Sequence, residues 1–77
     1  FVILISSSGE SANIINAAIF LNKINLDYIC FTGFDKDNAL RKLGKLNMHV
    51  PSKNYNIVEN THQVWLLSVI DFLIYKR

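Results

Sequence analysis

Residues 1–11 read FVILI followed by SSSGES, and this junction decides the fold class. The apolar run at 1–5 predicts a strand that is buried on both faces. A hydroxyl-rich turn follows it, and a helix-patterned segment begins at Ser11. Proteins of the α/β class bind phosphate where such a strand meets such a helix, because first-turn amides and the helix dipole favour an anion there. Gly9 lets the backbone approach that anion closely.

The rest of the chain alternates strand patterns with helix patterns. Pro51 ends the third strand, and a polar connection leads from it into the last helix. This β-α-β-α-β-α order predicts a parallel sheet with right-handed crossovers and helices covering its faces. The expected elements are a strand at 1–6, a helix at 11–24 capped by Ser11, a strand at 26–32, a helix at 37–43 closed by Gly44, a strand at 46–50, and a helix at 57–75.

With 77 residues, about half of them apolar, the chain suits one small domain or a piece of a larger one. Three strands make a small sheet. A strand that begins at residue 1 and is buried on both faces needs further residues to cover it. We therefore expect the carboxyl-terminal part of a longer protein, whose preceding residues supply more strands and the second wall of any ligand site.

The net charge bears on the class of partner, and the cysteine content bears on the cellular compartment. The net charge is +2, and the Lys and Arg residues are scattered, so we expect no nucleic-acid partner. Cys30 is the single cysteine and lies in an apolar run, which favours a reduced thiol in a core over a disulfide framework. These features predict a cytoplasmic protein.

The last helix is apolar nearly all round. Between residues 64 and 75 only Ser68 and Asp71 are polar, apart from the tyrosine hydroxyl at the end. Twelve such residues fall short of the roughly 18 that a membrane span needs. We therefore expect a buried helix or a subunit interface, and no membrane partner.

Four motifs in order resemble the sugar isomerase (SIS) domain and, within it, the phosphoheptose (sedoheptulose 7-phosphate) isomerase group. They are SSSGES at 6–11, TGFD at 32–35, VPS at 50–52 and IVENTH at 57–62. The likeness covers essentially all 77 residues. The resemblance implies that residues 1–77 are the carboxyl-terminal portion of one SIS domain. It also implies a three-layer, flavodoxin-like parallel sheet with helices on both faces, and a homodimer or homotetramer assembled through the last helix.

The same resemblance implies the ligand and the reaction. The hydroxyls that would hold the phosphate of a sugar phosphate belong to Ser6, Ser7, Ser8 and Ser11. The reaction would be aldose–ketose isomerisation in carbohydrate metabolism, supplying precursors of sugar nucleotides or surface glycans. This chemistry needs a base, an acid, and an electrophile or metal that stabilises the enediolate.

Glu59 and His62 are the candidate catalytic residues. They are three residues apart, so on a helix they share a face and can meet at one ligand or metal, although an exposed helix pair has the same spacing. By resemblance, Glu59 occupies a position that is a metal ligand in zinc-containing members, and His62 matches the first of two helix histidines. The second histidine position is Leu67 here, and leucine neither carries a proton nor binds zinc.

Because Leu67 occupies the second histidine position, two other functions remain open. One is a non-catalytic SIS module that acts as a phosphosugar sensor or a protein-binding scaffold. Another is an oligomerisation domain without a ligand, in which the serines only cap a helix.

Two departures from the family pattern are smaller, and four further residues have expected roles. Glu10 stands where the family commonly has Asn and brings a negative charge beside the expected phosphate site, and residues 36–37 replace a common Gly-Gly pair. We expect His49 to be structural, Trp65 and Phe72 to be packing anchors, and Tyr55 to be a loop contact near the site.

Overall fold

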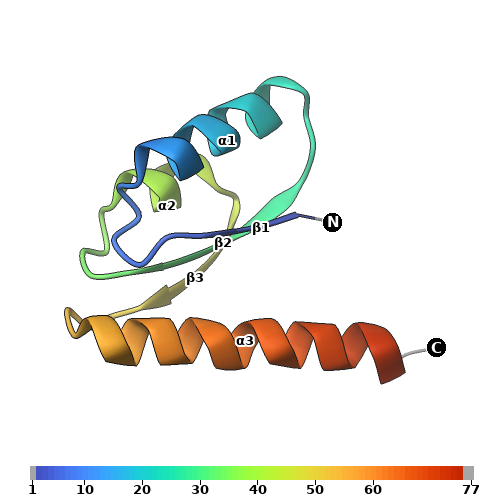
Figure 1. The fold of residues 1–77 in the computed structure, drawn as a ribbon. Coiled ribbons are helices and arrows are strands. Elements are labelled where there is room, and N and C mark those ends of the chain that lie inside the picture. Colours follow the sequence, from blue (N-terminus) through green and yellow to red (C-terminus); the bar gives the residue numbers. More distant parts are fainter. Residues whose placement is uncertain (1, 76–77) are drawn as a thin grey trace.

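The computed structural model describes residues 2–75 and confirms the expected β-α-β-α-β-α order (Figure 1). The strands are all parallel and lie in the order β1-β2-β3, so β2 is central. Figure 1 shows α1 and α2 on one face of the sheet and α3 on the other. The elements are β1 (Val2–Ile5), α1 (Ala12–Lys23), β2 (Tyr28–Gly33), α2 (Ala39–Leu43), β3 (Leu46–Val50) and α3 (Tyr55–Tyr75).

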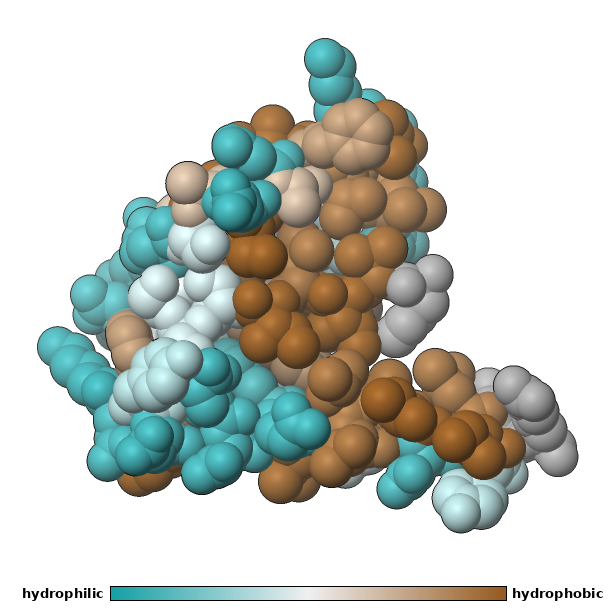
Figure 2. All heavy atoms as spheres, in the orientation of Figure 1, coloured by the Kyte–Doolittle hydropathy of each residue, from teal (hydrophilic) through white to brown (hydrophobic). Residues whose placement is uncertain are grey.

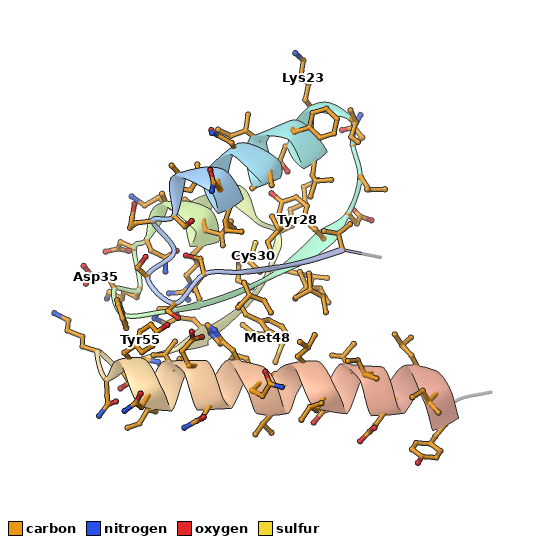
Figure 3. All side chains as sticks on the ribbon, viewed as in Figure 1. Lys23, Tyr28, Cys30, Asp35, Met48 and Tyr55 are labelled. Carbon is orange, nitrogen blue, oxygen red and sulfur yellow. The ribbon has the colours of Figure 1, made fainter. Side chains whose placement is uncertain are left out.

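The main core lies between the sheet and the helices α1 and α2. Leu4 of β1 is in register with Cys30 of β2, and both side chains are buried on this face. The α1 spacing of apolar residues places Ala18 and Leu21 against them. Figure 3 shows Cys30 on the side of the sheet that faces these helices. The expectation of a free, buried cysteine is confirmed.

The first half of α3 covers the opposite face of the sheet. Phe31 of β2 is fully buried and meets the edge of Trp65 at a ring-centroid distance of 5.4 Å. Val58 is also fully buried, and a Cβ added at Gly33 would lie 2.5 Å from its Cγ1. Glycine at the end of β2 therefore lets α3 approach the sheet closely.

Helix boundaries differ from the expected ones because asparagine side chains cap the helices. The Asn38 Oδ1 accepts a hydrogen bond from the backbone N–H of Arg41 at 2.8 Å, so α2 begins after Asn38. The Asn54 Oδ1 accepts bonds from the N–H groups of Asn56 and Ile57. The helix α3 therefore begins at Tyr55, and the expectation that Tyr55 lies in a loop is wrong.

The second half of α3 remains exposed on the described chain. Val64 is 61% exposed and Leu67 is 50% exposed, although the sequence predicts that this helix is covered. Within residues 2–75, no helix is sufficiently long and apolar to cross a membrane. The rest of the described chain therefore does not bury the apolar surface in the second half of α3.

Candidate functional site

Three loops meet at the carboxyl edge of the sheet. They are residues 6–11 after β1, which we call the serine loop, residues 34–38 after β2, and residues 51–54 after β3. The backbone N–H of Phe34 donates to the Ser52 carbonyl at 3.0 Å and so ties the second loop to the third. Figure 2 shows hydrophilic surface gathered at this end of the molecule. Ligands of open α/β sheets bind at this edge.

The serine loop holds its shape through two of its own hydroxyls. Ser6 Oγ accepts a hydrogen bond from the backbone N–H of Gly9 at 3.1 Å, and Ser8 Oγ accepts one from the N–H of Glu10 at 3.1 Å. Gly9 has a φ of 70°, in the left-handed region that glycine adopts readily. Because Ser6 and Ser8 act as acceptors here, each hydroxyl proton can still be donated to an anion.

Ser7 and Ser11 are the two hydroxyls of the loop without a partner. Within residues 2–75, neither side chain makes a hydrogen bond. Ser11 is the N-cap residue of α1, as expected, with extended backbone, but its side chain does not cap the helix. The positive end of the α1 dipole therefore faces the loop without a side-chain acceptor. This arrangement is suited to binding a phosphate-sized anion.

Glu10 is engaged with the next helix. Its Oε2 accepts a hydrogen bond from the backbone N–H of Ala39 at 3.0 Å, and the Gly9 carbonyl accepts one from Leu40 at 2.9 Å. The carboxylate thus lies at the amino-terminal end of α2, where negative charge is favourable. The Glu10 side chain is thus turned towards α2.

Glu59 is paired with Tyr55. The Tyr55 hydroxyl donates to Glu59 Oε1 at 2.7 Å, one helical turn away. This hydrogen bond, together with the charge of Glu59, raises the pKa of Tyr55. A carboxylate that accepts this bond still has lone pairs for a second donor.

His62 is buried beneath the sheet. It is 2% exposed, and its Nε2 donates to the Thr32 carbonyl at 2.9 Å. With a single ring proton on Nε2, Nδ1 carries a lone pair, and within residues 2–75 this atom is buried without a hydrogen-bond partner. Within residues 2–75, Glu59 and His62 have different hydrogen-bond partners, so no shared polar contact joins them.

Thr32 binds both histidines of the chain. Its carbonyl accepts from His62, and its Oγ1 lies 2.8 Å from Nδ1 of His49. Burial lowers the pKa of His49, and the charge of Arg41 adds to this effect. The sequence pointed to Thr32 only as part of the TGFD motif. The strand register pairs Thr32 with His49, and the packing of α3 on the sheet brings His62 to the Thr32 carbonyl.

The described residues do not form a zinc site by themselves. Zinc sites need three or four protein ligands, and within residues 2–75 no three His, Cys, Asp or Glu side chains gather in a group that could hold a metal. Leu67 lies in the exposed half of α3, five residues after His62 and about 140° around the helix from it. The position of the second histidine thus points away from His62.

The chain was also compared with known proteins. No protein-family model matches it, and no curated protein matches it. The geometry of the carboxyl edge and the four sequence motifs are therefore the features that point to a function.

Proposed function

We propose that this chain belongs to the SIS-domain family and binds a sugar phosphate, with the phosphate on the serine loop. One observation carries this proposal: the loop joins β1 to the start of α1, and its Ser7 and Ser11 hydroxyls have no partner within residues 2–75. Backbone N–H groups and hydroxyls together match the acceptor oxygens of a phosphate. The parallel sheet and the β-α-β-α-β-α order support the proposal, as parts of a flavodoxin-like, three-layer domain.

The proposed reaction is aldose–ketose isomerisation of the phosphoheptose isomerase type. His62 has a free lone pair on Nδ1, and Glu59 has free lone pairs on its carboxylate, so both can accept a proton. The SIS resemblance of IVENTH at 57–62 supports their assignment to this site. Assembly as a homodimer or homotetramer through α3 and a cytoplasmic location belong to the same proposal.

Two observations favour a second candidate, a non-catalytic phosphosugar-binding module. His62 is almost fully buried, with Nε2 committed to the Thr32 carbonyl, so only a rearrangement would bring its Nδ1 to a substrate. Leu67 supplies no acid or base at the second histidine position. Such a module would act as a sensor or as a scaffold for another protein.

Binding is tested by titrating the chain with sedoheptulose 7-phosphate and following backbone amide shifts by NMR. We expect the largest shifts in the serine loop and at the start of α1. A charge-assisted hydrogen bond contributes roughly 1.5–3 kcal/mol, so Ser7→Ala and Ser11→Ala should each weaken binding about tenfold or more. The matched control is Ser68→Ala, because the Ser68 hydroxyl donates to the Val64 carbonyl on α3. Equal effects of all three variants, or no shifts in the loop, would reject the phosphate site.

Catalysis is tested by assaying isomerisation of sedoheptulose 7-phosphate by the natural protein, with and without added zinc. Turnover would place the protein among the enzymes, with another group in place of the missing histidine. Binding without turnover, and turnover gained by Leu67→His, would establish the binding module. Leu67→Gln is the matched control, since it is polar but cannot exchange a proton near neutral pH.

A further inference from the structure

A pocket of about 250 Å³ lies at the amino edge of the sheet, at the opposite end from the serine loop. Tyr28 and Leu46, the first residues of β2 and β3, line this pocket together with residues of the turns that precede these strands. Pockets for drug-sized ligands have volumes of roughly 300–1,000 Å³, so this one suits a smaller molecule.

Three side-chain contacts hold the walls of the pocket in place. The Tyr28 hydroxyl donates to Oδ1 of Asn22 on α1 at 2.8 Å, and Nδ2 of Asn22 donates to the Leu43 carbonyl on α2 at 3.2 Å. Figure 3 shows Tyr28 between the sheet and α1. On the β3 side, Nδ2 of Asn47 donates to the Gly44 carbonyl at 2.8 Å. The pocket is therefore formed before a ligand arrives, which lowers the ordering cost of binding.

The turn after α1 forms another wall. Asn25 has a φ of 58°, and its N–H donates to the Asn22 carbonyl at 3.2 Å. The N–H of Leu26 donates to the Leu21 carbonyl at 3.0 Å. Many helices end in this way, with Gly or Asn at the left-handed position. The turn thus fixes the backbone on which Asp27 follows.

Asp27 and Lys45 bring opposite, unpaired charges to this pocket. Both side chains line it and are exposed, and within residues 2–75 neither forms an ion pair or a hydrogen bond. Opposite charges that do not pair with each other can each bind a complementary charge of a ligand between them. The negative end of the α1 dipole lies at the same edge, where it favours a cation beside Asp27.

The rest of the lining is largely apolar. Leu26 is 46% exposed and Leu46 is 62% exposed, and Leu43 lines the pocket with them. An apolar group in the pocket would remove part of this leucine surface from water. The pocket therefore offers one carboxylate, one ammonium group and an apolar wall.

We propose that this pocket binds an apolar α-amino acid in its zwitterionic form. The ammonium group of the ligand binds Asp27, its carboxylate binds Lys45, and its side chain lies against Leu26 and Leu46. A ligand with only one of the two charges would lose one ion pair and leave a charge of the pocket without a partner. This site is separate from the serine loop and does not rest on the proposed phosphate binding.

The experiment titrates the full chain with L-leucine and follows backbone amide shifts by NMR. We expect saturable shifts at residues 25–28 and 43–46, and none in the serine loop. Two analogues of leucine each lack one charge: 4-methylpentanoate lacks the ammonium group, and 3-methylbutylamine lacks the carboxylate. Each analogue should bind about tenfold more weakly, because one charge-assisted contact is lost.

Charge-neutralising variants test the two ion pairs. Asp27→Asn and Lys45→Gln should each weaken leucine binding about tenfold. Asp37→Asn and Lys53→Gln are the matched controls, because they remove exposed charges outside the pocket, and they should leave leucine binding unchanged.

The amide spectrum of each variant without ligand checks that it is folded. If one pocket variant unfolds, the other variant and the two analogues still test the site. Absence of saturable shifts at the amino edge would overturn the proposal. Analogues that bind as well as leucine would also overturn it, as would equal weakening by the pocket variants and their controls. Failure of the phosphate site would leave all of these results unchanged.

Discussion

Replacing Gly9 with alanine should damage both the serine loop and the amino-terminal cap of α2, because Gly9 is buried against Asn38. Gly9 has a φ of 70°, and a Cβ at this position would overlap the side chain of Asn38. Asn38 is 1% exposed and caps α2 by accepting from the N–H of Arg41 at 2.8 Å. Its Nδ2 also donates to the Asp35 carbonyl at 2.9 Å. A methyl group on Gly9 therefore strains the loop and displaces the cap of the next helix.

The expected loss of stability has three parts. Left-handed backbone at alanine costs about 1–2 kcal/mol. Loss of the Asn38 cap costs about 1 kcal/mol, and leaving its buried amide without its carbonyl partners costs about 1–2 kcal/mol. We therefore expect Gly9→Ala to lower the free energy of unfolding by about 4 kcal/mol.

A double-mutant cycle with Asn38→Gly tests this reasoning by urea unfolding at one fixed protein concentration. Asn38→Gly removes the three atoms that would lie nearest to the new methyl group, which all belong to the Asn38 side chain. In that background Gly9→Ala should cost only the backbone strain, about 1–2 kcal/mol. Equal costs in the two backgrounds, or a cost below about 1 kcal/mol in the natural chain, would refute the proposed contact.

Three further predictions use single side chains. Burial lowers the pKa of His49 below its ordinary value of 6.5, so the unfolded chain binds more protons and the free energy of unfolding should fall as pH drops through 6.5. His49→Asn should flatten that fall in urea titrations at several pH values, and an unchanged slope would contradict it. Burial raises the pKa of Cys30 to about 11, so a thiol reagent at pH 8 should modify Cys30 only as fast as the chain unfolds, rather than at once. Glu10→Ala removes the acceptor of the Ala39 amide, and should speed hydrogen exchange there and lower stability by about 0.5–1 kcal/mol, whereas unchanged exchange would show that the bond is absent in solution.

The order of elements could be read from the sequence because hydrophobic periodicity and turn residues are local signals. Runs such as 1–5 and 28–31 are apolar without alternation, as strands covered on both faces are. The boundaries were less predictable, since Asn38 and Asn54 cap helices through side-chain bonds that composition does not reveal. The polar residues around Tyr55 predict a loop for this reason, whereas α3 begins at Tyr55.

The serine loop could also be located from the sequence, because a strand-to-helix junction is defined by neighbouring residues. The hydrogen-bond partners of its side chains could not be predicted from the sequence. Glu10 turns to the N–H of Ala39, which is 29 residues away along the chain, and only the packing of α2 beside the loop brings them together. His62 meets the Thr32 carbonyl across 30 residues in the same way.

The sequence by itself determined the alternation of strands and helices, the site of the serine loop and the apolar character of the last helix, because each depends on residues close together in the chain. The tertiary structure decided which face each helix covers and which side chains remain without partners. It buries His62 while leaving Leu67 exposed on the same helix. The physical reason is that α3 is longer than the sheet face it covers, so one helix has a buried first half and an exposed second half (Figure 1).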